Sequence, residues 1–134
     1  MNPLQRFELS GRVAVVTGGS SGIGASLGQA LGLAGASVVL VARRRADLDT
    51  TANDLFRMGI QVKTVAADLS RPEAVEGISA KALGCFGDVD ILVNAAGVNL
   101  REPFQEVSLD SWSQQIHLHL TAPMFLTQAF APRM

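Results

Sequence analysis

A glycine-rich segment at residues 17–24 joins an apolar run to a helical pattern, and this arrangement most constrains the fold. The run at 13–16 is typical of a buried strand, and the apolar spacing from Ile23 onward is typical of a helix. Glycines permit a tight turn at this point, and the free amides at the start of a helix attract anions. The segment therefore predicts a phosphate site, and hence a nucleotide ligand. An ordinary strand-to-helix turn is the alternative interpretation of the glycines alone.

Apolar runs and helical stretches alternate along the rest of the chain. We expect further strands over residues 36–42, 60–66 and 89–94. We expect helices over 47–56, ended by Gly59, from a capping-box pattern at 70–73 to Leu83, and from 109 to about 131, with a local kink at Pro123. Such alternation implies parallel strands with right-handed crossovers and helices on both faces. The expected fold class is α/β, a three-layer Rossmann-type doubly wound parallel sheet of about four strands in the order 3-2-1-4.

Composition indicates a folded protein and narrows the kind of partner. The chain has 134 residues, of which 48% are hydrophobic and 17% charged, so a buried core is expected. A net charge of −1 gives no general attraction to nucleic acid or anionic membranes. The single Cys85 cannot form an internal disulfide, and no apolar stretch reaches the roughly 18 residues that span a bilayer. We expect a soluble cytoplasmic protein that binds neither nucleic acid nor membrane.

If the nucleotide is a dinucleotide such as NAD or NADP, the residues after the second strand indicate which of the two is preferred. At this position an acidic residue bonds the ribose 2′-hydroxyl of NAD, whereas arginine accommodates the 2′-phosphate of NADP. Ala42 stands where the acid would be, and Arg43, Arg44 and Arg45 follow. Because guanidinium–phosphate bonds are strong and planar, we expect NADP(H) as the preferred cofactor, with NAD(H) possible. Three solvated arginines at the start of a surface helix are the alternative interpretation.

Taken together, the motifs resemble those of the N-terminal half of the short-chain dehydrogenases/reductases. TGGSSGIG at 17–24 resembles the family's TGxxxGxG, Asp68-Leu69 resembles its acidic position after strand three, and the sequence at 94–97 resembles its NNAG. The resemblance runs through almost the whole chain and is nearest to gluconate 5-dehydrogenase-like and 3-oxoacyl reductase-like members. It implies a single NAD(P)-binding Rossmann domain over residues 1–134, truncated at its C-terminal side relative to the family.

The resemblance also implies roles for individual residues. The glycine segment would line the pyrophosphate, Asp68 would bond the adenine amino group, and the residues after the fourth strand would border the riboses. The cofactor-binding residues implied in this way are Gly18, Ser20, Ser21, Gly22, Ile23, Gly24, Arg43, Arg44, Asp68, Leu69, Asn94, Ala95, Ala96 and Gly97. From the residues alone, Asp68 can also be a carboxylate at a helix N-terminus, and both roles can hold at once. Asn94 can be a simple cap at a strand end, an alternative that the Gly97 after it disfavours.

The family's catalytic residues have no match in this sequence. Members of the family use a serine together with a Tyr-x-x-x-Lys motif, but this chain has no tyrosine, and Lys63 and Lys81 lie outside such a motif. His119 stands where the family has a helix-four asparagine that holds a relay water. It could bond such a water or simply line the site. His117 and His119, two residues apart on a helix, face different directions, so no metal site is expected.

Two functions follow from these features. We expect the cofactor-binding half of an NADP(H)-dependent oxidoreductase that interconverts an alcohol and a ketone, inactive as this chain alone. The alternative is a non-catalytic nucleotide-binding or dimerising module, because the last helix and the apolar edge strand need a partner surface. That helix carries, at helical spacing, Leu109, Trp112, Ile116, Leu120 and Leu126. By the resemblance, the full-length form would be a homo-oligomer.

Overall fold

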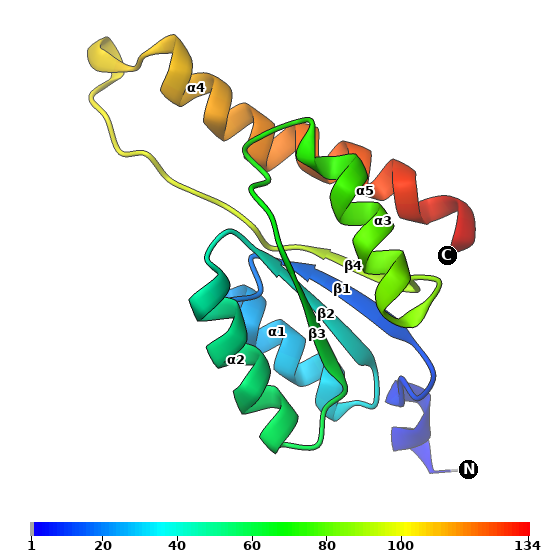
Figure 1. The fold of residues 1–134 in the computed structure, drawn as a ribbon. Helices are drawn as coiled ribbons and strands as arrows, with labels where there is room; N and C mark the ends of the chain where they lie inside the picture. Colours follow the sequence, from blue (N-terminus) through cyan, green and yellow to red (C-terminus); the bar gives the residue numbers. More distant parts are fainter. Residues whose placement is uncertain (1) are drawn as a thin grey trace.

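Four parallel strands form the central sheet of the computed structural model, which describes residues 2–134 (Figure 1). The strands are β1 (Val13–Thr17), β2 (Ser37–Ala42), β3 (Val62–Ala66) and β4 (Ile91–Asn94). Their order in the sheet is β3-β2-β1-β4, so the predicted order and fold class are confirmed. The chain adds β2 and β3 on one side of β1 and then crosses to the other side to form β4. The switch point therefore lies between β1 and β4, and sheets of this kind bind ligands there.

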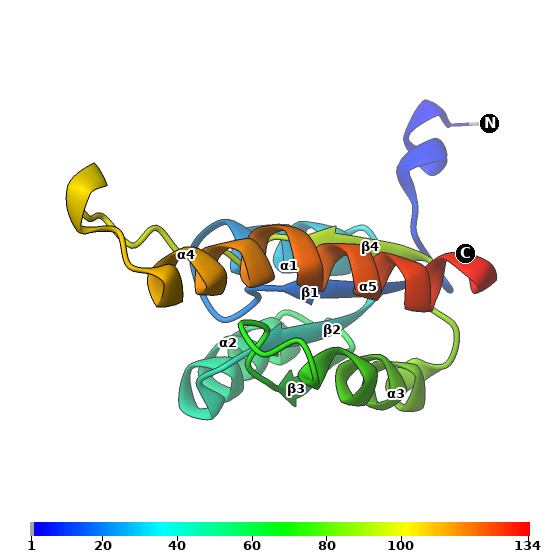
Figure 2. The ribbon, with the colours of Figure 1, turned by 90° about the horizontal axis from the view of Figure 1, so that it is seen from above.

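Helices cover both faces of the sheet. Figure 1 shows α1 (Gly22–Leu33) and α2 (Arg45–Arg57) on one side, with α3 (Ala74–Phe86) and α5 (Ala122–Phe130) on the other. In Figure 2, α4 (Leu109–Ile116) and α5 run on as one long helix. The short 3-10 helices are η1 (Pro3–Phe7), η2 (Phe104–Glu106) and η4 (Ala131–Arg133). None of the helices within residues 2–134 is long and apolar enough to cross a membrane.

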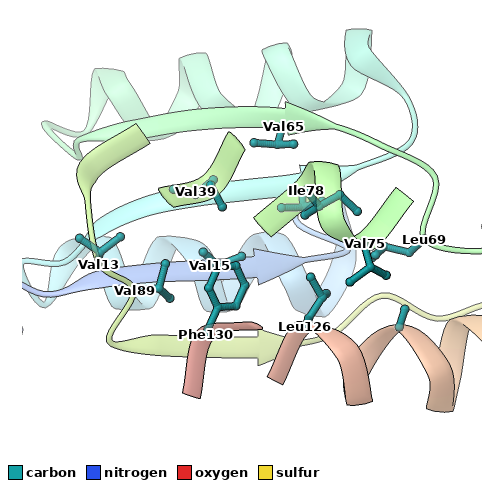
Figure 3. Close-up of a cluster of buried hydrophobic side chains, with 13 residues drawn as sticks. Val13, Val15, Val39, Val65, Leu69, Val75, Ile78, Val89, Leu126 and Phe130 are labelled. Atoms are coloured by element: carbon teal, nitrogen blue, oxygen red, sulfur yellow. The ribbon is translucent and has the colours of Figure 1, made fainter. Parts of the chain in front are cut away.

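Each face of the sheet has its own buried cluster. Val15 and Val39 point to one face and pack with Phe130, in the cluster drawn in Figure 3. Leu40 points to the other face and packs with Leu48 of α2. Strands buried on both faces must be apolar at every position, and for this reason they appear in the sequence as continuous hydrophobic runs.

Glycine ends α2 as the sequence predicted. Gly59 has φ +83°, and its N–H donates to the Phe56 carbonyl at 2.9 Å. The N–H of Ile60 donates to the Leu55 carbonyl at 3.2 Å. This pair of bonds is the Schellman motif, which turns the chain toward β3.

The capping box predicted at 70–73 does not form. α3 begins at Ala74, and its N-cap residue, Glu73, makes no side-chain capping bond. The Ser70 hydroxyl instead donates to Oδ1 of Asp68 at 2.7 Å, so it orients a carboxylate at the end of β3. A serine followed three residues later by glutamate was therefore a local signal that a nearby acceptor overrode.

The last helix is interrupted at its centre by a π turn, His117–Thr121. The N–H of Ala122 bonds to the His117 carbonyl, five residues back. Pro123 follows directly and has no N–H to donate, so the distortion predicted around this proline takes the form of a widened turn. The turn contains His119.

At the amino-terminal end of the strands, Asp90 links β4 to β1. Its Oδ2 accepts from the Val13 N–H at 2.9 Å and its Oδ1 from Arg12 Nη1 at 2.8 Å. Both bonds lower the pKa of Asp90 below its usual value, and the bond from the Val13 backbone has the larger effect. The carboxylate aligns the starts of the two strands whose other ends flank the switch point.

Candidate cofactor site

A pocket of about 500 Å³ opens at the carboxyl edge of the sheet, among the loops that follow all four strands. All but Gly22 and Asn94 of the cofactor-binding residues expected from the sequence line it. The lining is completed by residues that were not among the expected cofactor-binding residues: Ala42, Ala67, Ser70, Val98, Leu100, Gln114 and Leu118. The fold therefore brings together segments that are far apart in the chain, as the doubly wound topology requires.

Two glycines allow the loop after β1 to lie against its neighbours. Gly18 has φ +66°, and a Cβ there would lie 2.8 Å from both the Ala95 carbonyl oxygen and the Ala96 nitrogen. A Cβ on Gly24 would overlap the Gly18 carbonyl oxygen. These obstacles are backbone atoms, which cannot rotate away. Glycine is therefore required at both positions by close packing of main chain on main chain.

The first turn of α1 faces this pocket. Ser21 is its N-cap and makes no side-chain capping bond, and Ser21, Ile23 and Gly24 line the pocket. Gly22, with φ +55°, has no atom within 4 Å of where its Cβ would stand. The helix start therefore has uncapped amides and open space beside it, which are the features of an anion site.

Thr17, at the end of β1, organises the loop after β4. Its hydroxyl accepts from the N–H groups of Ala95 and Ala96, both at 3.1 Å, and donates to the Val93 carbonyl at 3.3 Å. The residue is 1% exposed. Thr17 is the first residue of the glycine motif TGGSSGIG, and no separate role was predicted for it. The available signal was a hydroxyl at the end of an otherwise apolar buried strand.

The three arginines after β2 differ in their surroundings. Arg44 Nε pairs with Asp47 Oδ2 at 2.6 Å, and Arg45 Nε pairs with Asp49 Oδ2 at 3.6 Å. Arg43 lines the pocket and has no ion-pair partner among residues 2–134. Arg44 also lines the pocket, whereas Arg45 does not. Of the three arginines, Arg43 is the one that lines the pocket without an ion-pair partner within residues 2–134, so its guanidinium is available to bind an anion.

Asp68 is held as a carboxylate. Its Oδ1 accepts from the Ser70 N–H at 3.0 Å and from the Ser70 hydroxyl at 2.7 Å. Burial alone would raise the pKa of Asp68, but the Ser70 bonds and the nearby Arg43 and Arg71 outweigh it and hold the pKa below its usual value. Asp68 therefore offers the pocket an ionised acceptor at neutral pH.

His119 contacts the loop after β4 and does not line the pocket. Its Nε2 lies 2.8 Å from the Val98 carbonyl oxygen and 3.3 Å from the Val98 nitrogen. The shorter contact is that of an Nε2–H donating to the carbonyl. A Cβ on Gly97 would lie 3.0 Å from His119 Cε1, so the ring fills the space that glycine leaves. Residues 2–134 contain no cluster of three or more His, Cys, Asp or Glu side chains that could hold a metal ion.

Comparison with known proteins identifies the family to which this chain belongs. Residues 12–134 match the family model described as short chain dehydrogenase. Gluconate 5-dehydrogenase of Gluconobacter oxydans is 36% identical over 129 residues, which are 96% of this chain and 50% of that protein. The chain thus spans about half the length of the curated relatives it matches.

Solved structures agree with this match. L-Sorbose reductase of Gluconobacter frateurii, solved with NADPH and L-sorbose, has a TM-score of 0.90 and 36% identity, covering 96% of this chain and 49% of that one. A 3-oxoacyl (acyl-carrier-protein) reductase of Agrobacterium tumefaciens with NADP bound has a TM-score of 0.92 and 28% identity, covering 100% and 52%. The predicted resemblance is confirmed: the chain belongs to the short-chain dehydrogenase/reductase family.

Proposed function

We propose that this chain is the cofactor-binding part of an NADP(H)-dependent short-chain oxidoreductase, and that the whole protein interconverts an alcohol and a ketone. On this proposal residues 1–134 are a single NAD(P)-binding domain. The observation that carries the proposal is one pocket that combines an uncapped helix start, an ionised carboxylate and an arginine without an ion-pair partner among residues 2–134. These groups match, in order, a pyrophosphate, an adenine amino group and a 2′-phosphate.

The residues of this chain would bind and orient the dinucleotide, which supplies the hydride. The amides at the start of α1 would bind the pyrophosphate, and Arg43 the 2′-phosphate. Asp68 would accept from the adenine amino group, because it is ionised and therefore an acceptor only. Ala95, Ala96 and Gly97 would border the riboses, held in place by the Thr17 hydroxyl.

We assign His119 a positioning role in this site and no proton transfer. Its ring lies against Gly97 and bonds to the Val98 backbone, so it would hold the wall of the nicotinamide end of the pocket. The chain has no tyrosine to act as the family's general acid. We therefore expect cofactor binding from these 134 residues and no turnover.

Titration calorimetry of the purified chain with NADPH and with NADH tests the proposal. We expect NADPH to bind at least about tenfold more tightly, since a hydrogen bond to a charged group contributes roughly 1.5–3 kcal/mol. A circular-dichroism melt on the same sample establishes that it is folded. A folded chain that binds neither dinucleotide would contradict the proposal, and one that prefers NADH would contradict the cofactor assignment.

A second function, self-association through α4 and α5, is favoured by the exposure of apolar side chains there. Leu126 is fully buried, but Trp112 is 57% and Leu120 62% exposed. Leu109 is exposed as well, so three of the five residues of the predicted apolar stripe face solvent, as the residues of an oligomer interface would in the separated chain. We propose a second copy of the chain as the partner of this surface.

Sedimentation velocity over a range of concentrations measures this association. We expect a dimer at high concentration that Trp112→Glu dissociates, because a charge in an apolar interface would be desolvated without a partner. Phe56→Glu is the matched control, since Phe56 is 72% exposed but lies on α2, across the sheet. A monomer at every concentration would contradict the self-association proposal.

A further inference from the structure

Thr51 links α2 to the glycine loop, although the two are far apart in the chain. Its Oγ1 donates to the Ser20 carbonyl oxygen at 2.9 Å, across 31 residues of sequence. Among the described residues, 2–134, this is the one side-chain hydrogen bond that the loop at 18–24 receives from another element. Thr50, its neighbour on α2, donates instead to the Ala46 carbonyl of its own helix at 3.0 Å.

The loop has little support on the side from which Thr51 reaches it. A second, open groove of about 600 Å³ lies between α1 and α2, lined among others by Ser20, Ser21 and Thr51. Ser20 and Ser21 also line the cofactor pocket. The peptide that joins these two serines therefore borders two hollows.

The Thr51 bond decides which way this peptide points. A trans peptide is planar, and its C=O and N–H point in opposite directions. With the Ser20 carbonyl directed to the Thr51 hydroxyl, the Ser21 N–H is directed away from Thr51, and Ser21 also lines the cofactor pocket. If the peptide turned over, a carbonyl oxygen would face the pocket and repel a phosphate.

We propose that Thr51 is a positioning residue for pyrophosphate binding: by holding the Ser20 carbonyl, it aims the Ser21 amide at the bound anion. This inference rests on the proposed dinucleotide site, and it deepens that site by adding a residue that touches no part of the ligand. Its role is separate from that of Arg43, which on the proposed function would bind the 2′-phosphate of the adenosine.

Three variants isolate the hydroxyl: Thr51→Val removes it at almost the same volume, Thr51→Ser restores it, and Thr50→Val removes a hydroxyl that bonds only within α2. The ligands are NADPH and adenosine 2′-monophosphate, which has the 2′-phosphate but neither half of the pyrophosphate. We expect Thr51→Val to weaken NADPH binding about tenfold, the effect of losing one bond to a charged group, and to leave binding of the monophosphate unchanged. Thr51→Ser and Thr50→Val should both bind NADPH like the unaltered chain.

Inorganic pyrophosphate, followed by the amide NMR resonance of Ser21, tests the inference without any dinucleotide. We expect pyrophosphate to shift that resonance in the unaltered chain, in Thr51→Ser and in Thr50→Val. In Thr51→Val we expect no such shift. That result, together with a failure to bind NADPH, would leave the inference standing and reject the proposed function. An unmoved Ser21 resonance in the unaltered chain, an equal shift in Thr51→Val, or equal weakening of both nucleotides in that variant would overturn the inference.

Discussion

Replacing Gly24 with alanine is expected to abolish detectable NADPH binding and to lower the stability of the chain. The new methyl group would overlap the Gly18 carbonyl oxygen, and Gly18 is itself packed against the backbone of Ala95 and Ala96. Neither side can yield by rotating a side chain, so the loop after β1 must move as a whole. Overpacking of this kind costs about 1–3 kcal/mol. The displaced loop would also carry the α1 amides away from the anion.

Gly77→Ala is the matched control for this prediction. Gly77 lies within α3, and a Cβ there would meet no atom within 4 Å. Alanine in a helix interior is favoured over glycine by about 0.5–1 kcal/mol, so this variant should melt slightly higher and bind NADPH unchanged. Melting curves and calorimetry on both variants measure the two effects. Native affinity in Gly24→Ala would show that the loop tolerates the methyl group and that the packing argument is wrong.

The elements of this fold could be predicted because each has a local cause. The apolar runs of β1 and β2 are strands buried on two faces, and Gly59 marks the end of α2 through a left-handed conformation. The strand order then follows from the Rossmann-type doubly wound pattern, which has its glycine turn after the first strand. These are statements about neighbours in sequence or about rules of connection, and a single sequence contains both.

The parts of the site that escaped prediction depend on contacts between distant segments. Thr17 and Thr51 act through backbone groups 76 to 79 and 31 residues away, respectively. Ser70 escaped prediction for a different reason: the capping-box pattern at 70–73 takes no account of Asp68, two residues earlier, to which the Ser70 hydroxyl donates. Hydroxyl groups bond to whichever acceptor the fold presents, so their partners become evident only once the loops are assembled.

Replacing Arg43 with glutamine is expected to remove the preference for NADPH. Glutamine keeps a hydrogen-bonding side chain but has no charge. The other two guanidinium groups directly after β2, those of Arg44 and Arg45, pair with Asp47 and Asp49. NADPH affinity should fall about ten- to hundredfold, the range for bonds to a charged group, while NADH affinity stays the same. Calorimetry with both dinucleotides measures the ratio directly.

Arg43→Gln also alters Asp68, and the pH of the measurement separates the two effects. Arg43 helps to lower the pKa of Asp68, so its loss moves that pKa upward, toward the ordinary value near 4. At pH 7 the carboxyl remains ionised in both forms, and the fall in NADPH affinity there belongs to the 2′-phosphate. Arg45→Gln, which changes an arginine outside the pocket, should leave both affinities unchanged. An equal loss of NADH binding in Arg43→Gln would mean that Arg43 acts on the whole adenosine end through Asp68 and does not read the phosphate.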